Sequence, residues 1–124
     1  MNKKPKILLI DENKVLGEKV KDFLENSGFD VEIETSPIDA MFLMSIPKAW
    51  DAIIIDDESN ETSIMVIEDM ITKHHMNGIL LTSRDHQNIS LPKVEKPHGT
   101  VPNYHKLVNY IMDFIQPLEK VQVM

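Results

Sequence analysis

The chain has 124 residues, a formal net charge of -7 at pH 7 and no cysteine. That length suits one domain with a substantial core and is too short for two. The acidic balance, without a cluster of lysine and arginine, argues against a nucleic-acid surface, which needs basic side chains to displace counterions from phosphates. The composition excludes disulfides and thiolate metal sites, and no apolar stretch approaches membrane-spanning length. We therefore expect a cytoplasmic protein that binds neither nucleic acid nor membrane.

Apolar runs typical of buried strands alternate with segments of helical period, which predicts repeated βαβ units and a parallel sheet. The first run is Ile7 to Ile10, and the helix predicted after it has Asn13 as its N-cap and Gly28 as its stop. Residues 31–35 alternate in polarity, as in a strand with one wet face at a sheet edge. A second helix is predicted between residues 36 and 47, because Ser-Pro opens this segment and a proline closes it.

The second half of the chain repeats this order of strand and helix. The runs Ala52 to Ile55 and Ile79 to Leu81 lack alternation, as expected for central strands that helices cover on both faces. A helical stripe from Val66 to Ile71 lies between them, and a weaker run, Leu91 to Val94, is predicted to form the fifth strand. A last helix is predicted over residues 102–118, with proline near both ends.

The quality of the strands predicts the sheet topology. Continuous runs in the first, third and fourth strands indicate central positions, whereas the alternating second strand and the weak fifth strand indicate edges. The order 2-1-3-4-5 fits, and it places a crevice between the carboxyl ends of strands one and three.

Polar residues of three kinds follow the predicted strands. In an open parallel sheet the ligand crevice lies outside the carboxyl ends of the strands, so side chains distant in sequence converge there. We expect two carboxylates from the first strand end, one from the third, a hydroxyl from the fourth and an ammonium after the fifth to share one site. These residues are Asp11, Glu12, Asp56, Thr82 and Lys96.

This combination of groups fits phosphoryl transfer. Gathered carboxylates repel one another, so the cluster should either shift its pKa values or hold a divalent cation, and magnesium prefers such oxygen ligands. Once the bound cation neutralises part of the negative charge of the cluster, a carboxylate oxygen of Asp56 can attack phosphorus and form an acyl phosphate. Lys96 would place a point charge on one phosphoryl oxygen, and Thr82 would donate a hydrogen bond to another.

These segments resemble the receiver domain of two-component response regulators, and the resemblance covers nearly the whole chain. Lys6 to Glu12 is similar to the family's first strand with its acidic pair, and Asp51 to Asp56 is similar to the strand that ends in the phosphoacceptor. Leu81 to Ser83 and Glu95 to Pro97 resemble its threonine and Lys-Pro motifs. Each fragment alone is weak, whereas the four in this order are specific.

The resemblance implies a flavodoxin-like, doubly wound α/β fold and a single receiver domain over residues 1–124. It implies that Asp56 takes a phosphoryl group from a histidine kinase or phosphotransfer protein, and that the domain signals to a protein target or a fused output domain and is not an enzyme. It also implies magnesium held by Glu12, Asp56 and the backbone carbonyl of Glu58, and a cis bond before Pro97. When Asp11 is added to these ligands, the predicted set of metal-binding residues is Asp11, Glu12, Asp56 and Glu58.

Several positions depart from the family's pattern. Glu12 stands where aspartate is usual, and Asp57 adds charge beside the nucleophile and is expected to point into solvent. Too few residues, most of them polar, separate Thr82 from Lys96, so the fourth helix is predicted to be short or absent. Lys93 replaces the aromatic residue of the family's switch, which removes the usual readout.

Other conspicuous residues receive plainer interpretations. His86 has no partner at metal-ligand spacing, so no role is predicted for it. The adjacent pair His74 and His75 does not share a helix face, and a solvated helix end is expected there. Trp50 is expected to be a packing residue.

Two other functions remain open alternatives. A pseudo-receiver would keep the pocket residues and signal through binding alone, without a phosphoryl cycle. A haloacid-dehalogenase-like phosphatase would use Asp56, Glu58, Thr82 and Lys96, but its acidic metal pair should follow the lysine, whereas here an acidic pair comes first. A flavin site is excluded because the turn after the first strand lacks a glycine-rich or hydroxyl-rich phosphate cradle.

Overall fold

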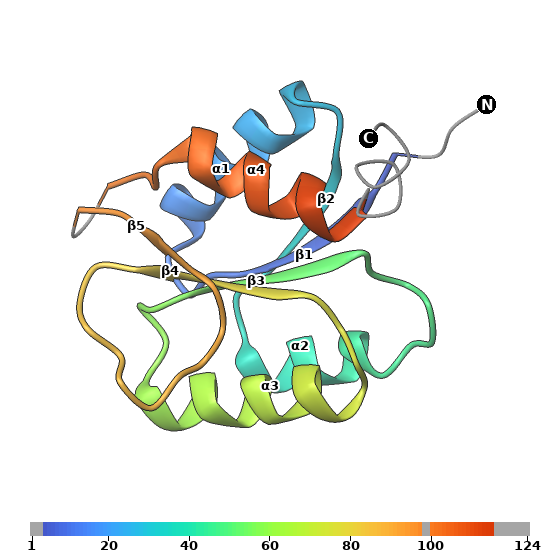
Figure 1. Ribbon diagram of the computed structural model, residues 1–124, viewed down its shortest axis with the longest axis vertical. Helices are drawn as coiled ribbons and strands as arrows, with labels where there is room; N and C mark the ends of the chain where they lie inside the picture. Colours follow the sequence, from blue (N-terminus) through green and yellow to red (C-terminus); the bar gives the residue numbers. More distant parts are fainter. Residues whose placement is uncertain (1–3, 98–99, 116–124) are drawn as a thin grey trace, which may run out of the picture.

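Five parallel strands form one sheet in the predicted order, β2-β1-β3-β4-β5 (Figure 1). This computed structural model describes residues 4–97 and 100–115. The elements are β1 (Lys6–Ile10), α1 (Lys14–Asn26), β2 (Asp30–Glu34), α2 (Pro37–Met44), β3 (Ala52–Asp56), α3 (Glu61–Lys73), β4 (Gly78–Thr82), β5 (Lys93–Glu95) and α4 (Tyr104–Ile115).

Helices cover both faces of the sheet, with α1 and α4 on one side and α2 and α3 on the other (Figure 1). Successive side chains of a strand point to opposite faces, so β1 feeds both cores. Ile7 and Leu9 join the cluster under α1 and α4, whereas Leu8 and Ile10 join the cluster under α2 and α3. All four side chains are fully buried, which explains why this run lacks alternation.

The helix ends follow the predicted caps. The Asn13 side chain accepts a hydrogen bond from the Leu16 amide at 3.2 Å, and Ser36 and Asn60 cap α2 and α3 in the same way. Gly28 adopts a φ of 101° just after α1, a conformation that glycine tolerates best. With these caps α1 begins at Lys14, soon after β1 ends at Ile10, and α3 begins at Glu61, soon after β3 ends at Asp56, so each helix begins near the end of the strand before it.

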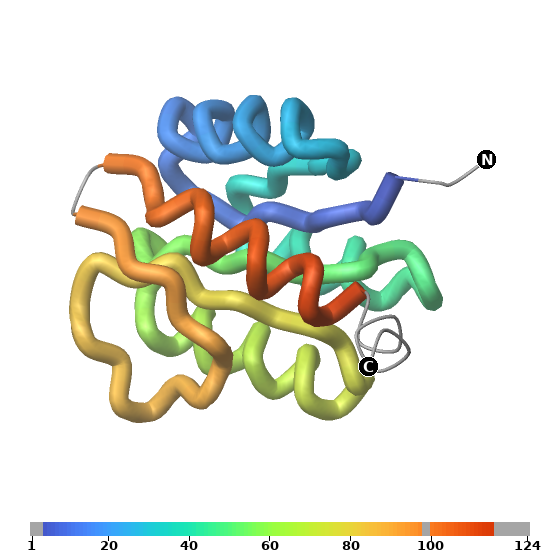
Figure 2. Tube along the Cα trace, turned by 45° about the horizontal axis from the view of Figure 1, so that its top comes forward, coloured from blue at the N-terminus to red at the C-terminus, as the bar shows by residue number. Residues whose placement is uncertain are grey.

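The connection between β4 and β5 contains no helix, as predicted. It runs beside the N-terminal part of α3 as an irregular segment (Figure 2). Ile89 and Leu91 are buried in the core under α2 and α3, where they supply apolar surface that a helix would otherwise provide. The Lys93 ammonium donates hydrogen bonds to the backbone carbonyls of both residues, and Glu68 of α3 accepts from Ser90.

The last helix begins at Tyr104, slightly later than the start near Pro102 that the sequence predicted. Its predicted end near Pro117, and Leu118 of its stripe, lie outside the described residues. Within residues 4–97 and 100–115, none of the helices is long and apolar enough to cross a bilayer.

Candidate functional site

A buried ion pair joins the ends of β3 and β5. Asp56 is the last residue of β3, Lys96 directly follows β5, and the Lys96 ammonium lies 2.8 Å from Asp56 Oδ2. The two residues are only 1% and 3% exposed, so water screens the pair weakly. The Glu58 amide donates to Asp56 Oδ1 at 2.9 Å. The structure thus brings together the predicted nucleophile and the predicted charge-compensating lysine.

Asp11, directly after β1, adds a second buried carboxylate to this site. Its Oδ1 accepts from the Asn13 amide at 2.9 Å, while its Oδ2 is buried and has no hydrogen-bond partner. Gly17 of α1 faces it, and a Cβ added there would lie 3.4 Å from the Asp11 Cβ. The first turns of α1 therefore pack closely over the carboxylate.

The electrostatics at Asp11 and Asp56 favour a proton or a cation. Burial, and then the charge of Asp56, raise the pKa of Asp11 to about 7. Burial also raises the pKa of Asp56, although the hydrogen bond from Lys96 and the Glu58 amide oppose the shift. One ammonium therefore does not fully compensate two buried carboxylates.

The site fits a hard cation in part. The unpartnered Asp11 Oδ2 and the Asp56 carboxylate are oxygen donors of the kind that magnesium accepts, and magnesium needs only one or two carboxylates beside phosphate and water. In the described ranges, however, no three or more His, Cys, Asp or Glu side chains are arranged to hold a metal ion. Glu12 and Glu58 are exposed, so the predicted four-residue set remains a prediction.

A pocket of about 680 Å³ opens beside these residues. Glu12, Glu58, Ser59 and Arg84 contribute to its wall, so both acidic and basic groups border it. The Ser59 hydroxyl is buried there and has no hydrogen-bond partner. Unpartnered buried polar atoms are rare in proteins, and the two found among the described side chains, Asp11 Oδ2 and Ser59 Oγ, both lie at this edge of the sheet.

Asp57 was predicted to point into solvent, and that prediction is wrong. The residue is only 4% exposed, and its carboxylate accepts from the Ser83 amide at 2.8 Å and from the Ser83 and Thr82 hydroxyls. Its amide still bonds to the Leu81 carbonyl, so the ladder continues past β3 and the side chain points to the opposite face from Asp56. Burial alone would raise the pKa of Asp57, but hydrogen bonds from His86, Ser83 and Thr82 outweigh it and hold the pKa below its usual range.

Thr82 lies at the predicted edge of the sheet, and its hydroxyl contacts Asp57 and the adjoining loop. The hydroxyl oxygen lies 3.2 Å from Asp57 Oδ2, also contacts the Arg84 carbonyl, and accepts from the Arg84 amide at 3.2 Å. The predicted hydrogen bond from Thr82 to a phosphoryl oxygen would require this hydroxyl to change partner.

His86 is the residue that sequence reasoning missed. The residue is 2% exposed, and its ring bridges two carboxylates, with Nδ1 2.8 Å from Glu61 Oε2 and Nε2 3.0 Å from Asp57 Oδ2. These partners are 25 and 29 residues away in sequence, so no local spacing reveals them. The sequence offered one indirect sign, which is the absence of a helical pattern between Thr82 and Lys96. A segment without a helix must be held against α3 by individual side-chain contacts.

No family model matches this sequence, and no curated protein matches it. Solved structures do match. A CheY-like response-regulator receiver domain protein of Methanospirillum hungatei JF-1 is 17% identical, with a TM-score of 0.76 over 95% of this chain and 98% of its own. A receiver domain protein from Clostridium thermocellum is 20% identical, with a TM-score of 0.71 over 97% and 99% of the two chains.

A third similar structure contains a metal ion. The receiver domain of a sensor histidine kinase from Pseudomonas aeruginosa PAO1, with magnesium coordinated in its active-site cleft, is 17% identical, with a TM-score of 0.70 over 91% of this chain and 98% of its own. The chain has the receiver-domain fold. In the receiver fold described above, Asp11, Asp56 and Lys96 meet at one edge of the sheet, while Asp57 and His86 form a second polar group beside them.

The receiver-domain resemblance also implied a cis bond between Lys96 and Pro97, and this expectation is wrong. Every peptide bond in the described residues is trans. The Lys96 amide donates to the Thr82 carbonyl at 2.9 Å, so the strand pairing of β5 continues to this residue with an ordinary backbone. The ammonium reaches Asp56 from that backbone.

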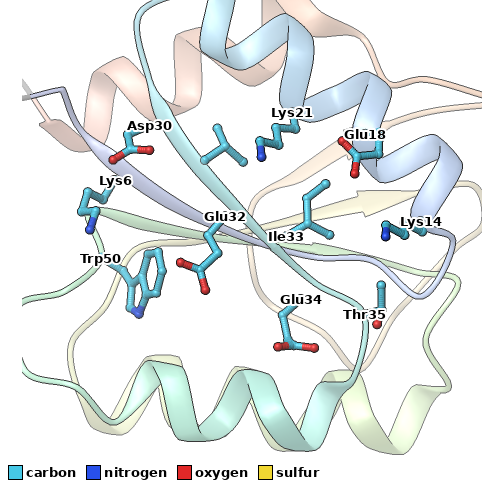
Figure 3. Close-up of a pocket in the computed structure, with 11 residues that line it drawn as sticks. Lys6, Lys14, Glu18, Lys21, Asp30, Glu32, Ile33, Glu34, Thr35 and Trp50 are labelled. Atoms are coloured by element: carbon cyan, nitrogen blue, oxygen red, sulfur yellow. The ribbon is translucent and has the colours of Figure 1, made fainter.

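A second pocket, of about 530 Å³, lies along the edge strand β2 of this receiver fold (Figure 3). Positively charged lysines and negatively charged carboxylates both line it, and the Lys6 ammonium lies 5.8 Å from the centre of the Trp50 ring. The Trp50 indole also donates to the Leu43 carbonyl at 2.9 Å, and its ring packs against the core, which confirms the predicted packing role. The pocket holds no cluster comparable to Asp56 and Lys96.

Proposed function

We propose that this chain is a receiver domain that accepts a phosphoryl group on Asp56 and signals by means of that modification. The observation that supports it most directly is the contact of 2.8 Å between the Asp56 carboxylate and the buried Lys96 ammonium, with Asp11 beside them. Buried carboxylates with perturbed pKa values next to a fixed cation are typical of functional sites. The fold of the similar solved structures agrees with this function.

The reaction proceeds by nucleophilic attack. An oxygen of the Asp56 carboxylate forms a bond to phosphorus while the bond from phosphorus to its donor nitrogen breaks, and the donor imidazole keeps the electron pair and takes up a proton. Asp56 then carries an acyl phosphate. Lys96 moves from the carboxylate to a phosphoryl oxygen, because the phosphoryl group carries more negative charge than the acyl oxygen that remains.

Magnesium is the proposed cofactor, held by Asp11 and Asp56 with Glu12 and Glu58 at the rim. When bound, magnesium neutralises charge on the phosphoryl oxygens and orients them for transfer. Asp11 would contribute an oxygen, Oδ2, that has no other partner. On Asp56, the oxygen Oδ2 already faces the Lys96 ammonium, which balances part of its negative charge. The carbonyl at Glu58 remains a further predicted ligand.

The proposed donor is a histidine kinase or a phosphotransfer protein, and the proposed output is a protein target or a fused domain. The domain would act as an acceptor in a signalling chain and not as an enzyme with turnover of its own. We propose that one receiver domain spans residues 1–124 and works in the cytoplasm.

Intact-mass measurement after incubation with acetyl phosphate and magnesium tests this function. The wild type should gain the mass of one phosphoryl group, and hydroxylamine should remove it because acyl phosphates react with that nucleophile. Asp56→Asn should gain no mass, while Asp85→Asn, an exposed carboxylate in the β4–β5 connection, should react like the wild type. A wild type that stays unmodified contradicts the proposal.

A binding module without a phosphoryl cycle is the second candidate. It is favoured by the connection without a helix and by Lys93 in place of an aromatic residue. The same mass measurement separates the two functions, because a pseudo-receiver gains no phosphoryl mass under any of these conditions.

A further inference from the structure

The solvent side of α2 carries a row of large apolar side chains. Ile38, Phe42 and Ile46 follow one another at intervals of four residues and are 66%, 70% and 50% exposed. Residues four apart lie on the same side of a helix. The Ile46 amide donates to the Leu43 carbonyl at 3.2 Å, so the helical turn continues past the end of α2 and places Ile46 one turn beyond Phe42. We call these three side chains the outer row of α2.

This row distinguishes α2 from the helices on the other face of the sheet. The outermost positions there are charged or polar, namely Glu18, Asp22 and Glu25 on α1 and His105, Asn109 and Asp113 on α4. The inner side of α2 is apolar as well, because Ala40 and Met44 are buried in the core. A helix that is apolar on all sides is normally covered on all sides, whereas single exposed apolar residues are ordinary. The outer row therefore indicates a surface that another molecule covers.

The outer row of α2 is complementary to itself. Its side chains read isoleucine, phenylalanine, isoleucine in both directions along the helix. When two copies of α2 pack antiparallel about a two-fold axis at Phe42, each Ile38 faces Ile46 of the other copy and the two rings meet at the centre. An interface with two-fold symmetry requires such a self-complementary patch.

The charges at the two ends of the row favour the same arrangement. Asp39 lies in the first turn of α2, Lys48 follows the end of the helix, and both are exposed. Among the described residues neither side chain has an ion-pair partner. In an antiparallel pair the acidic end of one helix lies at the basic end of the other, and the two helix dipoles oppose each other. The net charge of -7 repels a second copy at long range, but one acid and one base flank the row itself.

We propose that α2 is the contact surface of a weak, two-fold symmetric homodimer in which the outer rows of two copies pack antiparallel. Three side chains exposed by half or more present an apolar area on the order of 300 Å² on each copy. With the polar rim around them, two copies reach the low end of specific interfaces, about 1,200 Å² in total. Such an interface supports a reversible dimer with a dissociation constant on the order of 10–100 μM.

The dimer goes beyond the proposed function, because the contact requires no phosphoryl group. The helices α1 and α4 lie on the opposite face of the sheet from α2, so a contact through α2 leaves them uncovered (Figure 1). Two receiver domains held in this way can each use that face for other partners. The neighbouring helix α3 also exposes Met65 and Val66, which lie on the α2 side of the sheet and extend its apolar surface.

Sedimentation equilibrium of the full chain, at concentrations between about 10 μM and 1 mM, tests the proposal. The wild type should change from monomer to dimer over this range. Phe42→Ser removes the centre of the row from both copies and should weaken the dimer by about 30-fold or more. Val15→Ser is the matched control, because Val15 is 69% exposed and lies on α1, and it should dimerise like the wild type.

The circular dichroism of each variant shows that it is folded, which is expected because both side chains lie at the surface. Ile38→Ser provides a second substitution in the row and should weaken the dimer by a smaller factor than Phe42→Ser. A wild type that stays monomeric throughout the range overturns the proposal and means that a different molecule covers α2. A dimer that Phe42→Ser leaves unchanged also overturns it, because the copies then meet elsewhere.

A charge exchange tests the antiparallel direction. Asp39→Lys and Lys48→Asp each place like charges at both ends of the row and should weaken the dimer by about three- to tenfold at low salt. Lys48 has a φ of 57°, a conformation that aspartate accepts, so the second variant should fold. The two substitutions combined in one chain restore opposite charges and should bring the dissociation constant back to near that of the wild type. A combined variant that is weaker than either single variant overturns the antiparallel arrangement.

The dimer and the phosphoryl reaction can fail independently. Asp56→Asn should dimerise like the wild type although it takes up no phosphoryl group. A protein that dimerises through α2 but gains no phosphoryl mass contradicts only the proposed function, and a phosphorylated protein that stays monomeric contradicts only the dimer.

Discussion

Asp56 and Asp57 are neighbours in sequence, are 1% and 4% exposed, and yet lie in opposite electrostatic environments. The pKa of Asp56 is raised, chiefly by burial, whereas hydrogen bonds from His86, Ser83 and Thr82 lower the pKa of Asp57 despite its burial. Asp56 has one cation and one amide, and Asp57 has a full set of donors. Burial alone therefore does not decide whether a carboxylate is reactive, since the number of donors around it decides how available its charge is.

Removing the cation from the Asp56 side should produce the largest effect. Lys96→Met leaves the developing charge on the phosphoryl group without its ammonium, and the rate of phosphorylation by acetyl phosphate should fall by about 10²–10³-fold. A time course of intact mass measures this rate. Lys73→Met, which removes only an exposed ion pair with Asp69, serves as the control and should react at the wild-type rate. Equal rates in the two variants would exclude charge compensation by Lys96.

The next largest effect should come from Asp11, because burial and Asp56 raise its pKa from 3.8 to about 7. The folded protein keeps a proton that the unfolded chain loses near pH 3.8, so the stability from Asp11 is full below that pH and is lost as pH rises through about 7. Without metal, Asp11→Asn should raise the free energy of unfolding at pH 8 by roughly 2 to 4 kcal/mol.

Denaturant unfolding in a chelating buffer at pH 5 and pH 8 measures the Asp11 effect. The gain should be much smaller at pH 5, where most of the protein already carries the proton. Asp30→Asn, an exposed carboxylate at the start of β2, should show no such pH dependence. A gain of equal size at both pH values contradicts the electrostatic explanation.

Asp57 should show the opposite pH trend. Its lowered pKa means that its contribution to stability is present above the unfolded value of 3.8 and is lost as pH falls through the folded value. Asp57→Asn should therefore cost about 1 to 3 kcal/mol at pH 7, because buried donors lose an anionic acceptor. The cost should shrink below about pH 4, as followed by thermal unfolding across pH. A cost that stays constant between pH 3 and pH 7 would sink this account of Asp57.

Magnesium should have the smallest of these effects and should act only on the Asp56 side. At ten times its dissociation constant, the ion should stabilise the wild type by about 1.4 kcal/mol, seen as a rise in the melting temperature. Asp11→Asn should abolish the rise, and Glu12→Ala should weaken it if the rim carboxylates take part. Glu25→Ala, on the exposed side of α1, is the matched control. No rise in the wild type would contradict the magnesium site.

Most of the fold was predictable because its strands differ in their pattern of apolar and polar residues. The continuous runs of β1, β3 and β4 indicated central positions, and alternation in β2 indicated an edge, which together selected the strand order. The absence of a helix between β4 and β5 followed from chain length, since too few residues separate Thr82 from Lys96. Such properties are local, so one sequence suffices to show them.

The candidate site was predictable only in part, for a physical reason. Asp11, Asp56 and Lys96 each follow a strand, so topology alone brings them together. His86 lies in an irregular segment, and its contacts with Asp57 and Glu61 depend on how that segment folds back on α3. The burial of Asp57 was not predictable from the apolar run, because it follows from strand alternation that continues past the end of that run and turns Asp57 away from Asp56.

Phosphorylation of paired variants decides whether the two adjacent buried carboxylates, Asp56 and Asp57, have different tasks. Wild type, Asp56→Asn and Asp57→Asn are treated with acetyl phosphate and magnesium, and intact mass and fragment mass locate the modification. The claim predicts one phosphoryl group on Asp56 in the wild type and in Asp57→Asn, and none in Asp56→Asn. A phosphoryl group that persists in Asp56→Asn, or that disappears in folded Asp57→Asn, would contradict it.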